Sequence, residues 1–138
     1  MDKAITPANV KPSAGAQRSG GIANTGVDIE AGDLVAINAP YETLILFDAN
    51  AAYPANNLAG IAENKARAGQ YCSFITSDPD FTPGFTGLAN ETIIGSATAG
   101  KMASDADNAA GWYKTVLGVM TSTTKLNFSP IRTGVVTA

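Results

Sequence analysis

The sequence predicts an all-β fold, a small β-barrel or β-sandwich-like domain of two degenerate repeats with an extended N-terminal arm. First, the chain repeats itself, because residues 31–36 (AGDLVA) align without a gap with residues 89–94 (ANETII), 58 positions later. Second, aliphatic and β-branched runs alternate with clusters of Gly, Pro, Asn and Asp, which is typical of short strands joined by turns. Third, Pro, Asn or Asp interrupts the alanine-rich residues 48–59 and 103–110, which disfavours helices.

Length and composition narrow the class of protein. The 138 residues suit one domain, or two small half-domains that share a core. A net charge of −3 disfavours nucleic acid as a partner, since phosphate backbones are bound by clustered Lys and Arg. No apolar run approaches a membrane span and no hydrophobic signal segment is present, so we expect no membrane partner and synthesis in a reducing cytoplasm. The single cysteine, Cys72, lies in a predicted strand, where we expect a buried, inert thiol.

Residues 1–20 form a separate compositional block with few apolar residues. Such a segment buries too little apolar surface to fold alone, so we expect an extended arm that a partner holds, rather than one packed on its own domain. The arm residues expected to contact that partner are Lys3, Ile5, Val10, Lys11, Pro12 and Arg18.

The β-domain is expected over residues 21–138, with its first repeat at about 28–76. Strands are predicted at residues 22–29, 34–38, 41–47, 58–63 and 70–76. The continuous apolar run at residues 44–47 indicates a strand that is covered on both faces.

Residues 77–87 (SDPDFTPGFTG) are expected to form a turn-rich connector between the repeats. Its Phe81 and Phe85 either cap the core of their own domain or project into a neighbouring subunit, and the sequence leaves both alternatives open.

The second repeat is expected at about residues 88–137. Its predicted strands lie at residues 91–98, 112–120 and 125–137, and Asn90 stands where the first repeat has the turn residue Gly32.

No catalytic, cofactor or metal site is expected, and we predict that the protein is not an enzyme. Histidine is absent, which removes the commonest general base and transition-metal ligand. The carboxylate pairs Asp78/Asp80 and Asp105/Asp107 are typical of turns in which the side chain binds its own backbone, with calcium binding and glycoside hydrolysis as alternatives. Trp112, at the start of a strand, is expected in the core or an interface rather than in a sugar-stacking platform.

Three short motifs resemble the capsid cement, or head decoration, proteins of tailed bacteriophages. They are Gly32-Asp33-Leu34-Val35, Ala59-Gly60-Ile61-Ala62 and Val116-Leu117-Gly118-Val119, and residues 68–73 match a middle segment of the family loosely. The resemblance covers about residues 20–138.

This resemblance implies a small, often trimeric protein on the outer surface of the virion capsid, made in the cytoplasm of a bacterial host. Its partners would be the major capsid protein, bound partly through the arm, and further copies of itself. Phe81, Phe85 and Trp112 are the candidate contacts of such a homotrimer. The alternative function is a virion-surface module that recognises host glycans or the cell surface through Trp112, Tyr113 and the loop at Asp105.

Overall fold

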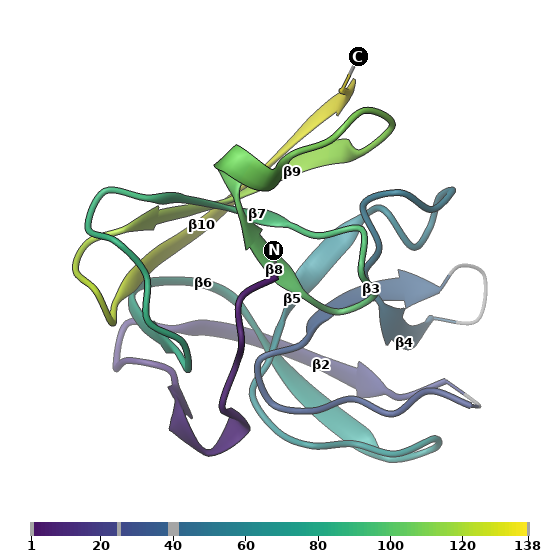
Figure 1. Ribbon diagram of the computed structural model, residues 1–138. Helices are drawn as coiled ribbons and strands as arrows, with labels where there is room; N and C mark the ends of the chain where they lie inside the picture. The colour runs from purple at the N-terminus through teal and green to yellow at the C-terminus, as the bar shows by residue number, and fades with distance from the viewer. Residues whose placement is uncertain (1, 25, 39–41, 138) are drawn as a thin grey trace.

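The computed structural model describes residues 2–24, 26–38 and 42–137, and the all-β prediction is confirmed (Figure 1). Within these residues there are ten strands and two short 3-10 helices. The bounds are η1 Pro7–Asn9, β1 Val10–Lys11, β2 Gln17–Ile22, β3 Leu34–Asn38, β4 Thr43–Leu46, β5 Leu58–Ala62, β6 Tyr71–Pro83, β7 Thr92–Gly95, β8 Met102–Ser104, η2 Asp105–Asp107, β9 Tyr113–Met120 and β10 Leu126–Val136.

The strands form one curled antiparallel sheet in the order β4-β3-β5-β6-β10-β9-β7-β8. The same pairing order occurs in both halves: β3 pairs with β4 and β5, and β5 with β6, while β7 pairs with β8 and β9, and β9 with β10. The long strand β6 pairs with β10 and so joins the two halves, and β1 and β2 also pair with β6.

Turn geometry repeats with the strands. Gly32 and Asn90, 58 positions apart, both have positive φ, at 94° and 69°. Glu42 and Gly100, also 58 apart, have φ of 57° and 79° in the turns before β4 and β8. Glycine and asparagine adopt this left-handed region most readily, which explains why Asn90 can replace the turn glycine.

The prediction of a turn-rich connector at residues 77–87 is wrong over most of its length, because β6 continues to Pro83. Pro79 and Asp80 together lie opposite the single residue Asn127 of β10, so the proline occupies a bulge. A bulge tolerates a proline that would break a regular central strand. The last part of β6 therefore already pairs with β10, a strand of the second half.

Most other predicted strands occur with shifted ends. The strands predicted at residues 34–38 and 112–120 correspond to β3 and β9. The strand predicted at residues 22–29 is wrong, because β2 lies before this segment and ends at Ile22. Tyr41, predicted as the first residue of a strand, lies outside the described residues.

Two apolar clusters fill the protein, because alternate residues of a strand face opposite sides of the sheet. Leu34 belongs to the larger cluster and its neighbour Val35 to the smaller one. Leu44 of β4 belongs to the smaller cluster and Phe47, just after β4, to the larger one, whereas Ile45 is half-buried and in neither, so the predicted coverage on both faces holds only in part. The larger cluster also holds residues from both halves, including Ile61, Ile75, Phe81, Ile93, Leu117, Met120, Leu126 and Phe128.

Glycine in the repeated Gly-Ile and Gly-Val motifs allows close approach of the next strand. A Cβ atom on Gly60 would overlap the carbonyl oxygen of Ile75, and one on Gly118 would overlap the carbonyl oxygen of Asn127. These two glycines lie 58 positions apart, in β5 and β9. Glycine recurs because at both positions the backbone of the next strand lies too close for a side chain.

The expectation that residues 1–20 form an arm detached from their own domain is wrong. Strands β1 and β2 both pair with β6, and Val10 is only 9% exposed within the larger cluster. Side chains of Ile5 and Val10 lie against Gly32 and Gly84, where any Cβ atom would collide with them. Composition did not predict this packing, because the segment is held by two aliphatic side chains and by backbone pairing with β6 rather than by a high apolar content.

Candidate functional site

The structure divides the predicted partner-binding residues of the arm into two groups. Lys3, Ile5 and Val10 lie inward: the Nζ atom of Lys3 is 2.8 Å from a carboxylate oxygen of Glu91, and the two aliphatic residues pack on the core. Lys11 is exposed, Pro12 is half-buried, and Arg18 is exposed and paired with Glu63 at 2.9 Å. Contact with a partner is therefore open to the second group only.

Phe81 and Phe85 are buried in the larger cluster, and Phe81 stacks at a tilt on Phe128 with 6.3 Å between ring centroids. Of the two alternatives predicted for these residues, capping of their own core is therefore the one observed, and their prediction as contacts between subunits is wrong. Trp112 is half-buried against the same cluster, while Tyr113 is 38% exposed. Burial within one chain removes the two phenylalanine rings from an interface, whereas Trp112 and Tyr113 keep part of their surface.

The acidic residue of each repeat motif closes a turn. Asp33 accepts a hydrogen bond from the backbone N–H of Glu30 at 2.9 Å, and Glu91 accepts one from Leu88 at 2.9 Å. Asp33 and Glu91 lie 58 positions apart, and both bonds span three residues. The carboxylate in the Gly-Asp-Leu-Val motif is thus explained by turn formation.

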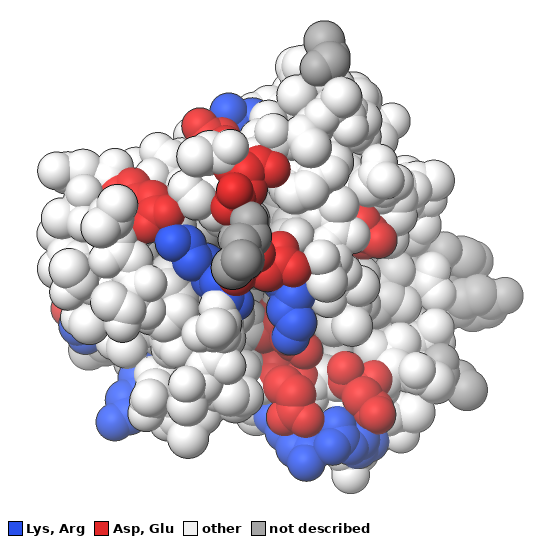
Figure 2. All heavy atoms as spheres, in the orientation of Figure 1, with Lys and Arg blue, Asp and Glu red and all other residues white. Residues whose placement is uncertain are grey.

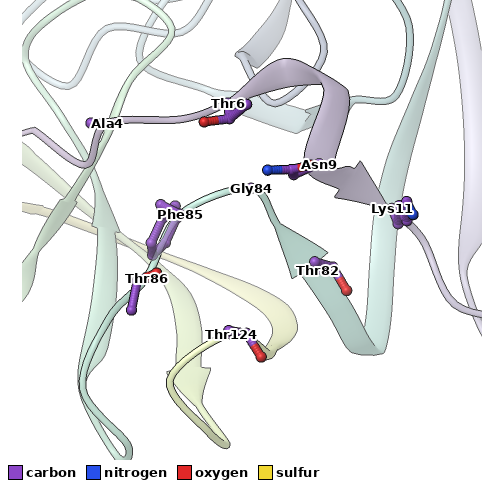
Figure 3. A pocket seen from close by; sticks show the side chains of 9 residues that line it. All are labelled: Ala4, Thr6, Asn9, Lys11, Thr82, Gly84, Phe85, Thr86 and Thr124. Atoms are coloured by element: carbon purple, nitrogen blue, oxygen red, sulfur yellow. The ribbon is translucent and has the colours of Figure 1, made fainter.

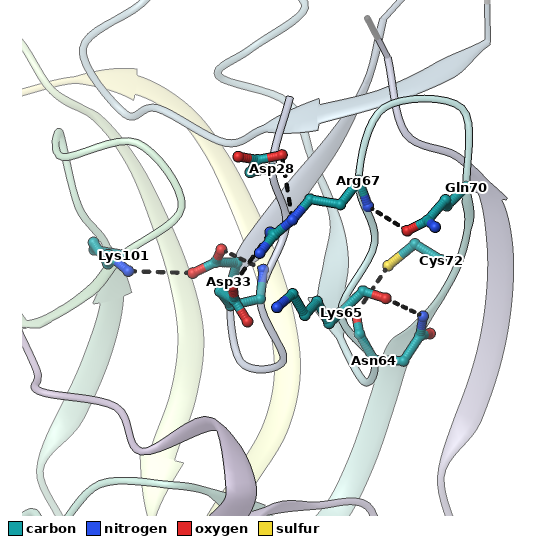
Figure 4. A network of polar contacts seen from close by, with 9 residues as sticks. Asp28, Asp33, Asn64, Lys65, Arg67, Gln70, Cys72 and Lys101 are labelled. Atoms are coloured by element: carbon teal, nitrogen blue, oxygen red, sulfur yellow. Dashed lines mark hydrogen bonds and ion pairs between the residues drawn. The ribbon is translucent and has the colours of Figure 1, made fainter. Parts of the chain in front are cut away.

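A lysine from elsewhere in the chain pairs with each of these carboxylates. Lys101 of the second half lies 3.3 Å from Asp33 of the first (Figure 4), and Lys3 of the arm pairs with Glu91 and lies 5.7 Å from the ring centroid of Phe85. Sequence reasoning missed these ion pairs, because the partners are far apart along the chain. The two ion pairs connect the arm and the first half of the chain to the second half.

The pKa of Glu91 is lowered. Burial raises this pKa, but hydrogen bonds from the Lys3 ammonium, the Leu88 N–H and the Ser104 hydroxyl, with the charge of Lys3, outweigh burial and lower it from 4.5. A carboxylate with a depressed folded-state pKa contributes stability above its unfolded pKa, and that stability is lost as pH falls through the folded pKa.

We therefore expect the wild-type protein to lose more stability than Glu91→Gln as pH is lowered from 7 to below 4.5. Urea unfolding at each pH measures the effect. Glu63→Gln, which removes a carboxylate paired with Arg18 elsewhere on the surface, is the control for the loss of one negative charge. Identical pH profiles for wild type and Glu91→Gln would contradict this role of the Lys3–Glu91 pair.

The two predicted carboxylate pairs have structural partners. Asp78 is buried and accepts hydrogen bonds from the Ser13 backbone N–H, the Ser13 hydroxyl and the backbone N–H of Asp80. Asp105 begins η2 and lies 2.8 Å from Lys114 Nζ. Asp78 joins the arm to β6 as well as binding its own backbone, which the sequence did not predict.

Cys72 is buried, as predicted, with its Sγ directed at the backbone carbonyl of Asn64 (Figure 4). Burial, more than the nearby charges of Glu63 and Asp33, raises the pKa of the thiol to about 11. The thiolate is the reactive form, so a raised pKa suppresses reaction.

We expect iodoacetamide to alkylate Cys72 in the folded protein at least about 100-fold more slowly than in urea at pH 8, since the pKa rises from 9.0 to about 11. Mass spectrometry of timed samples measures both rates. Equal rates in the two conditions would show that the thiol is accessible in the folded state.

Two of the surface cavities formed by the described residues are lined by the arm and by the junction of the strands. The first, about 440 Å³, lies where the arm crosses the end of β6, with Thr6 and Asn9 on one side and Thr82, Thr86 and Thr124 on the other (Figure 3). The second, about 400 Å³, has two tyrosines and two basic residues in its wall. It is lined by Ala52, Tyr53, Asn56, Asn57, Tyr113, Lys114, Thr115 and Arg132.

Charge is mixed over the face shown in Figure 2. Most of the Lys and Arg side chains that are described there lie beside Asp and Glu side chains, and they do not merge into a continuous basic area. Within residues 2–24, 26–38 and 42–137, no three His, Cys, Asp or Glu side chains are grouped so as to hold a metal ion. The same residues contain no helix long and apolar enough to cross a membrane.

Neither a protein-family model nor a curated protein matches the chain. The site must therefore be interpreted from its own geometry.

The last part of β10 exposes three large aliphatic side chains. Beyond Phe128, β10 continues to pair with β9, whereas its described pairs with β6 end there, and this end of the strand projects from the body (Figure 1). Ile131 and Val135 are 60% and 62% exposed, and Val136 is 45% exposed. An unpaired strand edge with apolar side chains is suited to pairing with another chain.

Proposed function

We propose that this protein binds the outer surface of a tailed-phage capsid and stabilises the assembled head as a decoration protein. The observation that carries the proposal is the duplication. The motifs that resemble head decoration proteins supply the same structural features in both halves: the turn at Gly32 and Asn90, its carboxylate at Asp33 and Glu91, and a glycine of close approach in β5 and β9. A duplicated scaffold whose repeated residues serve turns and packing supports a structural role.

We further infer that the protein is not an enzyme. The chain contains no histidine, and the carboxylates of Asp33, Asp78, Glu91 and Asp105 are committed to backbone groups or lysines. Groups held in this way are positioned for structure rather than for proton transfer.

The proposed partners are the major capsid protein and further copies of this chain, at the outer surface of the virion, after synthesis in a bacterial cytoplasm. Lys11, Pro12 and Arg18 remain at the surface of the arm and are the proposed capsid contacts. With the phenylalanines buried, the edge of β10 at Ile131 and Val135 is the proposed contact of the homotrimer.

Sedimentation with undecorated heads tests the proposal. We expect the protein to pellet with heads and to raise the temperature at which they release DNA, because a ligand that binds only the assembled shell stabilises it by mass action. Ile131→Lys combined with Val135→Lys should weaken cross-linking between bound copies, whereas the exposed-turn variant Thr123→Lys should not. Failure of the wild-type protein to pellet with heads would contradict the proposal.

A further inference from the structure

The second cavity lies at the junction of the two halves of the sheet. Tyr53 and its neighbours come from the loop between β4 and β5, whereas Tyr113 and Thr115 come from β9 and Arg132 from β10. Clefts between structural units are common sites for small ligands. Its volume of about 400 Å³ is suited to one or two sugar rings.

The wall of this cavity combines flat aromatic surface with hydrogen-bonding groups. Tyr53 is 67% exposed and Tyr113 38% exposed, so both retain ring surface for a ligand. A sugar ring presents C–H groups that pack on an aromatic face, and its hydroxyls both donate and accept. Asn56 and Asn57 supply amide donors and acceptors to match those hydroxyls.

The cavity wall has basic residues and no carboxylate, in a chain whose net charge is −3. The ammonium of Lys114 is paired with Asp105 at 2.8 Å, which offsets its charge. Arg132 instead donates Nε–H and Nη2–H to the carbonyl oxygen of Leu58, a neutral acceptor. This neutral acceptor does not offset the charge of the guanidinium, which has N–H donors beyond the two that these bonds use.

We infer that this cavity binds an acidic saccharide, a sugar whose ring packs on Tyr53 and Tyr113 and whose carboxylate is bound by Arg132. A carboxylate matches the planar guanidinium in shape and charge, which distinguishes this ligand from a neutral sugar. The inference is independent of capsid binding. Of the residues predicted for glycan recognition, Tyr113 lines this cavity, whereas Trp112 and Asp105 do not.

Titration of the full-length protein with trigalacturonate and with neutral maltotriose, followed by amide chemical shifts, tests this inference. We expect trigalacturonate to shift resonances of the cavity residues and to bind at least about tenfold more tightly than maltotriose, since a hydrogen bond to a charged group contributes about 1.5–3 kcal/mol. Arg132→Met should remove this preference. Arg18→Met, which removes an exposed arginine outside the cavity, should keep it.

Because Arg132 also holds Leu58, a second variant is needed that leaves this contact in place. Tyr53→Ala removes a largely exposed ring, so the fold should be retained, checked by circular dichroism, while affinity for trigalacturonate falls about tenfold. Equal affinity for the two saccharides, no shift at concentrations up to about 10 mM, or unchanged affinity in Tyr53→Ala would each overturn the inference. Tighter binding of inorganic phosphate than of trigalacturonate would also overturn it.

Discussion

Deletion of residues 1–16 is expected to lower the free energy of unfolding by at least about 3 kcal/mol, because burial of an aliphatic side chain contributes about 1.5–3 kcal/mol and two are removed. The deletion takes away Ile5 and Val10, which cover Gly32 and Gly84, and also strand β1 and the Lys3–Glu91 ion pair. Urea unfolding of the full-length and shortened proteins measures the difference.

Point variants distinguish the stability lost with buried side chains from any effect of shortening the chain. Val10→Ala should cost about 2 kcal/mol, since it removes buried methyl groups, whereas Ala8→Ser, at an exposed position of η1, should change stability little. Unfolding of the shortened protein at the urea concentration of the full-length protein would show that the arm is not part of the fold. Attachment to a partner would then again be the better account of residues 1–20.

Alanine at Gly60 or Gly118 is expected to destabilise the protein by about 3 kcal/mol or more, since overpacking against backbone forces the strands apart. At Gly60 the added Cβ would overlap the carbonyl oxygen of Ile75, and at Gly118 that of Asn127. Backbone cannot move aside as a flexible side chain can. Chemical denaturation monitored by Trp112 fluorescence measures the loss.

Gly69→Ala is the matched control for these variants. Gly69 has φ of 82° but open space around it, so alanine there should cost only the backbone strain of the left-handed region, about 1–2 kcal/mol. Gly60 has no such positive φ, and its variant isolates the collision. Should Gly60→Ala be no less stable than Gly69→Ala, close approach of the strands would not be the reason for the repeated glycine.

Strands that are determined by the residue pattern of one short segment were predicted best. The β-branched and aliphatic residues 34–38 and 113–120 form β3 and β9 as expected, and the repeat reappears as equal pairing order and equal turn geometry. The connector prediction was wrong because two prolines and two glycines outweighed the alternation of buried residues in β6. Pro79 is accommodated only by a bulge opposite β10, and that pairing is a property of the whole sheet.

The candidate sites were less predictable, because they are assembled from distant residues. The sequence left open whether Phe81 and Phe85 cap their own core or contact a neighbouring subunit, and only the packing of distant residues around them shows that the larger cluster encloses them. The cavity at Tyr53, Tyr113 and Arg132 brings together three segments with no local motif. The one available signal was the exposed-aromatic interpretation of Tyr113, which named one residue of the cavity wall beside two residues that lie outside the cavity.

Electron cryomicroscopy of undecorated tailed-phage heads mixed with the purified protein tests the central claim most directly. The decoration account predicts ordered density for this β-domain at repeated positions on the outer surface, with Lys11 and Arg18 toward the major capsid protein and β10 edges between neighbouring copies. Heads that remain bare at saturating protein concentration, or density confined to the tail or the interior, would contradict it.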